Sequence, residues 1–184
     1  MKVFISGGCK SGKSALAEKI SVYLAKDAGP LHYAATMLPT DKEDEDRIIR
    51  HRDQRGHLGF ETIEMPRDIR RLQDSCAAGG TVLIDSLTAL LANEMFSPDG
   101  EINDTVHEKI ITDLSVLFLC IKNVIIVSDF IYSDAAFYDK LTLQYRNGLA
   151  AIDKFCALAC DTVFEAFCGS FITYKGGETF GEVF

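Results

Sequence analysis

A short segment rich in glycine stands between an apolar stretch and an amphipathic one, and it limits how the chain can fold. Residues 2–6 are predicted to form a buried strand, and residues 15–20 a helix. Between them lies the sequence Gly7-Gly8-Cys9-Lys10-Ser11-Gly12-Lys13-Ser14, which fits the pattern G-x-x-x-x-G-K-S. Glycines let successive backbone N–H groups turn toward a phosphate, and the N-terminus of the helix adds partial positive charge.

This pattern predicts a phosphate-binding loop (P-loop) for a nucleoside triphosphate. In such a loop Lys13 reaches the β- and γ-phosphates, and Ser14 binds Mg²⁺. The alternative is a glycine-rich turn that has no ligand. The strand before the loop and the helix after it favour the P-loop over this alternative.

The composition indicates a single domain over residues 1–184, because 47% of the residues are hydrophobic and 25% are charged. The formal net charge of −8 disfavours a nucleic-acid partner. We find no apolar run long enough for a membrane span and no signal peptide, so we expect a cytoplasmic protein. The six cysteines contain no C-x-x-C pair, and we expect reduced, buried thiols, except for Cys9 in the loop.

Acidic residues 41–46 precede a basic segment over residues 47–55, and this order suits the dipole of a helix. Arg47, His51 and Arg55 are spaced i, i+4, i+8, so they share one helix face. Two flanking arginines disfavour the protonated imidazole, which favours a neutral, nucleophilic His51 beside cations that can hold phosphates. The alternative is a solvated, salt-bridged surface helix, and the spacing alone favours that alternative.

A second candidate Mg²⁺ ligand ends an apolar segment. Residues 81–85 predict a buried strand whose last residue, Asp85, can hold Mg²⁺ directly or through water. A turn or helix-capping role is the alternative for Asp85. Ser86 is predicted to cap the next helix, which runs through Met95.

Further strands and helices alternate along the rest of the chain. Strands are predicted at residues 31–35, 60–64, 123–129, 161–167 and 171–174, and helices at 67–77, 103–121 and 136–160. This alternation predicts an α/β fold of the P-loop NTPase type, with a mostly parallel sheet flanked by helices. The polar end of the 123–129 strand is expected at the edge of the sheet that faces the ligand.

Together these motifs resemble the bifunctional adenosylcobinamide kinase / adenosylcobinamide-phosphate guanylyltransferase family of cobalamin biosynthesis. The matching segments span about the first half of the chain, in the order that the family shows. They are the P-loop, Tyr33-Ala34-Ala35-Thr36, Arg47-Ile48-x-x-His51-Arg52 with Arg55 beyond it, Thr62-x-Glu64 and Leu83-Ile84-Asp85-x-Leu87-Thr88. The histidine segment is the most specific of these, and it reverses the preference for a surface helix.

The resemblance implies two reactions. ATP or GTP phosphorylates adenosylcobinamide, and GMP then passes from GTP through His51 to adenosylcobinamide phosphate, giving adenosylcobinamide-GDP. The resemblance also implies Mg²⁺ as a cofactor at Ser14 and Asp85, a corrinoid substrate and a homotrimer. Besides the P-loop, the implied nucleotide-binding residues are Ala35, Thr36, Met37, Arg47, Arg52, Asp53, Gln54, Arg55, Glu64 and Asp85.

The second half of the chain departs from the family pattern Asn-Glu-Val-Gly. The corresponding residues here are Asp129-Phe130-Ile131-Tyr132. Because tyrosine lacks the conformational freedom of glycine, we expect the loop over residues 129–139 to follow a different path. The missing glutamate predicts weaker phosphorylation. Two other functions stay open: a diverged P-loop kinase or nucleotidyltransferase for another substrate, and a nucleotide-binding regulatory module without turnover.

Overall fold

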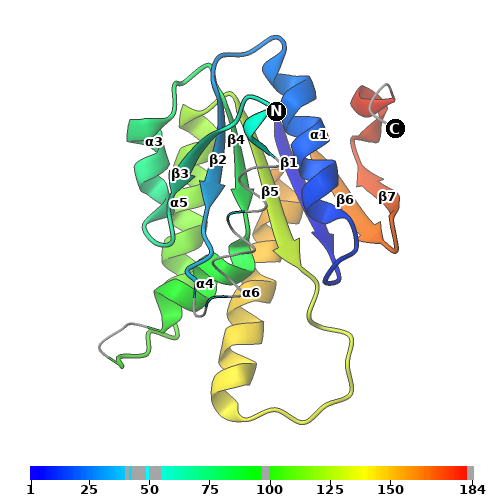
Figure 1. Ribbon diagram of the computed structural model, residues 1–184. Helices are drawn as coiled ribbons and strands as arrows, with labels where there is room; N and C mark the ends of the chain where they lie inside the picture. The colour runs from blue at the N-terminus through cyan, green and yellow to red at the C-terminus, as the bar shows by residue number, and fades with distance from the viewer. Residues whose placement is uncertain (40–41, 43–48, 50–54, 97–99, 182–184) are drawn as a thin grey trace.

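The computed structural model describes residues 1–39, 42, 49, 55–96 and 100–181 of the chain (Figure 1). The strands within them are β1 (Lys2–Gly7), β2 (Leu31–Ala35), β3 (Glu61–Glu64), β4 (Thr81–Asp85), β5 (Asn123–Asp129), β6 (Thr162–Phe167) and β7 (Ser170–Lys175). They form one sheet in the order β3-β2-β4-β5-β1-β6-β7. Only β6 and β7 pair antiparallel among these strands, so the sheet is mostly parallel, as predicted.

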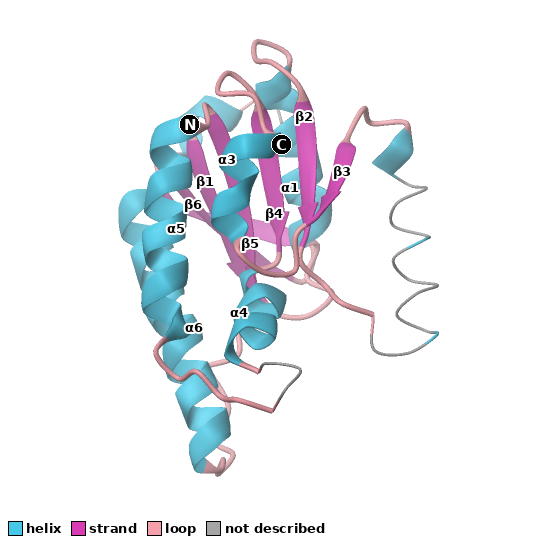
Figure 2. Ribbon diagram, turned by 90° about the vertical axis from the view of Figure 1, so that its left-hand side faces the viewer, coloured by secondary structure: helices cyan, strands magenta, loops and turns pink. Residues whose placement is uncertain are grey.

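Helices cover both faces of the sheet (Figures 1 and 2). They are α1 (Lys13–Ala25), η1 (Ile69–Arg71), α3 (Leu72–Ser75), α4 (Leu87–Met95), α5 (Val106–Cys120), α6 (Lys140–Ala159) and η2 (Gly177–Phe180). On one face, Leu16 of α1 belongs to the same buried cluster as Ile5 of β1. On the other face, Leu114 of α5 clusters with Phe4. Successive β1 residues thus serve opposite cores, because side chains alternate along a strand. This is the predicted α/β architecture.

Several local predictions are confirmed. β2 and β4 have the predicted bounds, and β1 and α1 flank the P-loop as expected. Ser86 caps α4, because its hydroxyl accepts a hydrogen bond of 3.4 Å from the backbone N–H of Ala89. The helix cap is therefore Ser86 and not Asp85, for which capping was the alternative role.

Helix bounds are where the predictions were wrong. The helix predicted over residues 67–77 is only the short pair η1 and α3, although its predicted apolar residues Ile69 and Leu72 are fully buried. The helix predicted from residue 136 begins at Lys140, because the Asp139 carboxylate accepts hydrogen bonds from the N–H groups of residues 141 and 142 and caps it. Likewise, α5 begins at Val106 and not at residue 103.

The cysteines are all free, which agrees with the prediction, but only half of them are buried. Cys120 and Cys168 were expected inside and are exposed. The reason is local, since Cys120 is the last residue of α5 and Cys168 lies in the turn between β6 and β7 with a φ of 49°. Among the helices that the structure describes, none has the length and apolarity needed to cross a membrane.

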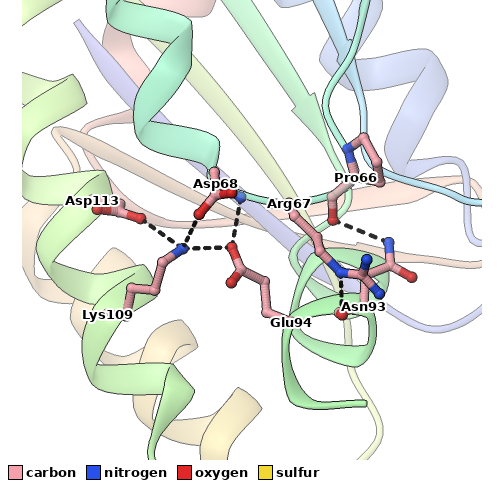
Figure 3. Close-up of polar contacts among 7 residues, drawn as sticks. All are labelled: Pro66, Arg67, Asp68, Asn93, Glu94, Lys109 and Asp113. Atoms are coloured by element: carbon pink, nitrogen blue, oxygen red, sulfur yellow. Dashed lines mark hydrogen bonds and ion pairs between the residues drawn. The ribbon is translucent and has the colours of Figure 1, made fainter. Parts of the chain in front are cut away.

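A polar network that the sequence did not predict holds the segment after β3 against α4 and α5 (Figure 3). Its members are Pro66, Arg67, Asp68, Asn93, Glu94, Lys109 and Asp113. The ammonium group of Lys109 lies 2.7 Å from Glu94 and 3.0 Å from Asp68. The amide of Asn93 donates a 2.7 Å hydrogen bond to the carbonyl of Thr36. The network therefore fixes α4 to the residue that follows β2, at the edge of the sheet where the parallel strands end.

Candidate active site

The carboxyl ends of three neighbouring strands bring the predicted phosphate-binding residues together. β4, β5 and β1 are consecutive in the sheet, and Gly7 pairs with Asp129 at their ends. Asp85 ends β4 beside Val127 of β5. In parallel α/β sheets this edge is where ligands bind. The P-loop, Asp85 and Asp129 thus share one end of the sheet, the end toward which the arrows of β1, β4 and β5 point in Figure 1.

The P-loop is held by its backbone against the turn between β6 and β7. The N–H of Gly169 donates a 3.1 Å hydrogen bond to the carbonyl of Ser11. Gly12 has a φ of 98°, which glycine adopts far more readily than other residues, and α1 starts directly after it. A side chain at Gly7 would collide with the carbonyl oxygen of Ala166 and lie 2.9 Å from Ser11 Oγ.

We expect Gly7→Ala to lower the free energy of unfolding by about 2 kcal/mol or more, because the added methyl group meets backbone atoms that cannot move aside cheaply. Urea denaturation followed by circular dichroism measures this change. Gly8→Ala is the matched control, since a Cβ at Gly8 meets nothing within 4 Å. Equal denaturation midpoints for the two variants would contradict the close packing of Gly7.

Lys13 is folded onto its own loop and onto β5. Its ammonium group donates a 2.7 Å hydrogen bond to the carbonyl of Gly8 and forms a 2.8 Å ion pair with Asp129. The Lys13 side chain is only 7% exposed, whereas that of Asp129 is 35% exposed. Lys13 is therefore placed to bind phosphate, because a bound phosphate group can replace Asp129 as its anionic partner.

Ser14 and Asp85 lie in contact, as the predicted Mg²⁺ site requires. The Ser14 hydroxyl donates a 2.9 Å hydrogen bond to Asp85 Oδ2, and the hydroxyl of Tyr33 donates to the same oxygen at 2.9 Å. Hydroxyl and carboxylate oxygens are ligands that Mg²⁺ prefers, together with water and phosphate oxygens. The residues present therefore fit Mg²⁺, which Ser14 and Asp85 would hold.

We expect Asp85→Asn to weaken the apparent affinity for Mg²⁺ by about 10- to 100-fold. The amide oxygen can still accept from Ser14 and Tyr33, so the fold should be kept while the charge that attracts the cation is lost. Turnover measured against Mg²⁺ concentration tests this expectation. Asp74→Asn removes the same charge from an exposed residue of α3 and serves as control. An unchanged Mg²⁺ dependence in Asp85→Asn would contradict the assignment.

Tyr33 links this site to the end of the basic segment. The guanidinium of Arg55 lies 3.5 Å from the centre of the Tyr33 ring, and the Arg55 side chain is buried. Burial, followed by the nearby Asp85 charge, raises the pKa of Tyr33 far above its usual range, so its hydroxyl remains a donor. Sequence reasoning used Tyr33 only as part of a motif and missed this contact. Its position two residues before the end of β2 was the available signal.

Ala35, Thr36 and Met37 lie where β2 ends and passes out of the sheet. Ala35 pairs with Asp85 of the neighbouring strand. The hydroxyl of Thr36 donates to the carbonyl of Ser86 at 2.8 Å and accepts from the N–H of Ser86 at 2.7 Å. Thr36 thus ties the end of β2 to the end of β4. The nucleotide contacts predicted for Ala35, Thr36 and Met37 stay predictions.

Glu64 is exposed at the end of β3, and it is not brought to the P-loop. β3 lies four places from β1 in the sheet order. At about 4.8 Å per strand this places their backbones roughly 19 Å apart. The other predicted site residues lie outside the residues that the structure describes: Arg47, His51, Arg52, Asp53 and Gln54.

The loop after β5 is held to α6 by charged and aromatic side chains. Arg146 donates to the carbonyl of Tyr132 at 3.2 Å and forms a 3.2 Å ion pair with Asp134. The hydroxyl of Tyr132 donates a 2.8 Å hydrogen bond to Asp153. Burial raises the pKa of Asp153 to about 6. Phe130 packs edge-on against Tyr132, with ring centroids 5.3 Å apart. The loop therefore presents aromatic side chains beside the P-loop edge.

The fold and site define a nucleotide-binding α/β protein of the P-loop class. The family described as cobinamide kinase / cobinamide phosphate guanyltransferase matches residues 3–173, and the chain belongs to this family. This confirms the family resemblance noted from the motifs.

Two relatives carry names that agree with this family. The bifunctional adenosylcobalamin biosynthesis protein CobP of Pseudomonas aeruginosa is 33% identical over 118 residues, which cover 64% of this chain and 66% of the relative. The bifunctional adenosylcobalamin biosynthesis protein CobU of Salmonella typhimurium is 27% identical over 187 residues, covering 95% of this chain and 100% of the relative.

Solved structures give looser matches. The flagellar accessory protein FlaH from Methanocaldococcus jannaschii has a TM-score of 0.47 and 13% identity, over 95% of this chain and 77% of that chain. The P4 protein from bacteriophage phi6 in complex with ADP also has a TM-score of 0.47, with 16% identity over 92% of this chain and 52% of that chain.

Proposed function

We propose that the protein is a bifunctional enzyme of cobalamin biosynthesis. It phosphorylates adenosylcobinamide with ATP or GTP and transfers GMP from GTP to adenosylcobinamide phosphate, giving adenosylcobinamide-GDP. The observation that carries the proposal is the contact between Ser14 of the P-loop and Asp85, with Lys13 beside them, in a chain of this family. A cytoplasmic location, expected from the sequence, and a homotrimer, expected from the family resemblance, are part of the proposal.

The first reaction uses the P-loop edge of the sheet. Backbone N–H groups of the loop and the N-terminus of α1 bind the phosphates, and Lys13 moves from Asp129 to the β- and γ-phosphates. Ser14 and Asp85 would hold Mg²⁺, which would offset the negative charge of the phosphates. The hydroxyl oxygen of adenosylcobinamide attacks the γ-phosphorus, and the bond from this phosphorus to the nucleoside diphosphate breaks. Catalysis here consists mainly of positioning and charge stabilisation.

The second reaction uses His51 as a nucleophile. A neutral imidazole nitrogen attacks the α-phosphorus of GTP. The bond from this phosphorus to the bridging oxygen of the β-phosphate breaks, and pyrophosphate leaves. The phosphate of the corrinoid then attacks the same phosphorus and releases the histidine. Arg47, Arg52 and Arg55 offset phosphate charge. The placement of Arg55 on Tyr33, whose hydroxyl contacts Asp85, supports this reaction close to the P-loop.

A different acceptor is the second candidate, because the loop after β5 carries Phe130 and Tyr132 in place of the family's glutamate and glycine. Incubation with adenosylcobinamide, Mg²⁺ and γ-³²P-labelled ATP or GTP tests the first reaction. Unlabelled adenosylcobinamide phosphate with α-³²P-labelled GTP tests the second. We expect labelled corrinoid in both assays and none when EDTA removes Mg²⁺. Labelling in neither assay by a folded protein that binds GTP would contradict the proposed function.

A further inference from the structure

Asp129 occupies a fixed position beside the phosphate-binding lysine. Its carboxylate oxygen Oδ1 lies 2.8 Å from Lys13 Nζ. The backbone on both sides is held, since the Asp129 N–H donates to Thr88 Oγ1 at 2.9 Å and the Phe130 N–H donates to the carbonyl of Gly7 at 2.8 Å. The backbone of Asp129 is therefore anchored to α4 and to the strand that enters the P-loop, and the ion pair with Lys13 holds its carboxylate at the site.

The other carboxylates that end parallel strands have different positions. Asp85 Oδ2 accepts the hydroxyls of Ser14 and Tyr33, which suits a metal ligand. Glu64 ends β3, three places from β5 in the sheet, a separation of roughly 14 Å at the usual strand spacing. Asp129 is beside Lys13, and its side chain is 35% exposed, so a ligand at the edge of the sheet can reach it.

We propose that Asp129 is the general base for the phosphoryl transfer, an inference that rests on the proposed function. The Asp129 carboxylate lies 2.8 Å from the ammonium group that is expected to bind the γ-phosphate, so a bound γ-phosphate would lie next to Asp129. A hydroxyl group that attacks the γ-phosphorus from this side would be within hydrogen-bonding distance of the carboxylate. As the hydroxyl oxygen bonds to the γ-phosphorus, its proton passes to Asp129, and the nucleoside diphosphate leaves with the electron pair of the broken bond.

The ion pair also gives Asp129 a second effect on the reaction. In the structure, the carboxylate contacts the ammonium group that incoming phosphates would also contact. Binding of the nucleotide draws Lys13 toward the phosphates, which frees the carboxylate for a hydrogen bond with the hydroxyl group of the substrate. Removal of the Asp129 charge should therefore slow phosphoryl transfer without weakening nucleotide binding. This combination distinguishes a general base from a residue that only shapes the site.

The test compares Asp129→Asn and Asp129→Ala with the wild-type protein, using γ-³²P-labelled nucleotide and adenosylcobinamide. We expect kcat to fall by about 10²-fold or more, the usual contribution of a general base. KM for the nucleotide should stay the same or decrease. Formate, a small carboxylate, should restore part of the activity of Asp129→Ala. Labelling of the protein by α-³²P-labelled GTP should be kept, because attack by a histidine needs no hydroxyl acceptor. Asp27→Asn, an exposed residue after α1, is the control.

Near wild-type kcat in Asp129→Asn would overturn the inference. So would a rise in KM with no rescue by formate, which indicates a structural role. If the wild-type protein phosphorylates no corrinoid, the proposed function fails separately. In that case, hydrolysis of the labelled nucleotide by water, measured in the same reactions, tests the inference. If Asp129 also activates water as a base, the hydrolysis rate should fall by the same factor in Asp129→Asn.

Discussion

Replacement of Lys13 by alanine is expected to lower kcat/KM for phosphoryl transfer by about 10²- to 10³-fold or more, the effect of removing one preorganised donor from a transition state. Lys13 is buried at the mouth of the P-loop, and its ammonium group already lies among the atoms that would surround a phosphate. Water cannot replace the ammonium group of Lys13. The dipole of a water molecule must reorient as the transition state forms, whereas the charge of Lys13 is already in place. Steady-state kinetics with γ-³²P-labelled nucleotide measures the loss.

Stability should not account for that loss. Asp129, the partner left behind, is 35% exposed, so water can solvate its carboxylate and the ion pair contributes little to folding. Lys19→Ala removes an exposed lysine from the same helix and should leave kinetics and thermal melting unchanged. A Lys13→Ala protein that is folded and retains more than a tenth of the wild-type rate would contradict the predicted role of the lysine.

Replacement of His51 by alanine is expected to abolish GMP transfer and to leave phosphorylation of the corrinoid nearly intact. A covalent route that loses its nucleophile has no second path of comparable rate, so the GMP-transfer rate should drop by at least about 10³-fold. In the proposed function, phosphoryl transfer relies on Lys13, Ser14 and Asp85, which are distant from His51 in sequence. Separation of the two corrinoid products by chromatography measures both reactions in one sample.

His57→Ala is the matched control for this prediction, because His57 is an exposed histidine just after the basic segment. It should keep both reactions. Parallel loss of both reactions in His51→Ala would indicate damage to the fold or to nucleotide binding. Retention of GMP transfer in that variant would assign the transfer to another residue.

The elements of the site could be predicted from sequence because each has a local signal. The P-loop pattern lies between an apolar strand and a helix, and Asp85 ends an apolar run, so both were found without knowledge of the strand order. The same is true of β2, which directly follows Pro30, and of β4, which contains β-branched residues and directly follows Gly80.

Contacts between elements could not be predicted in this way. The pairing of Lys13 with Asp129 exists because β5 lies between β4 and β1, an order that follows from crossover connections and not from any local pattern. The stacking of Arg55 on Tyr33 and the ion pairs of Lys109 likewise join residues that are distant in sequence. Helix starts were wrong where a cap such as Asp139 decided between neighbouring residues.

Covalent labelling by GTP tests the central claim most directly. The protein is incubated with Mg²⁺ and α-³²P-labelled GTP and then separated by denaturing electrophoresis, with His51→Ala and His57→Ala alongside. We predict a label that is lost in acid, kept in base and absent from His51→Ala, as expected for a phosphorus–nitrogen bond to histidine. A folded wild-type protein that binds GTP and acquires no label would contradict the proposed two-step transfer of GMP.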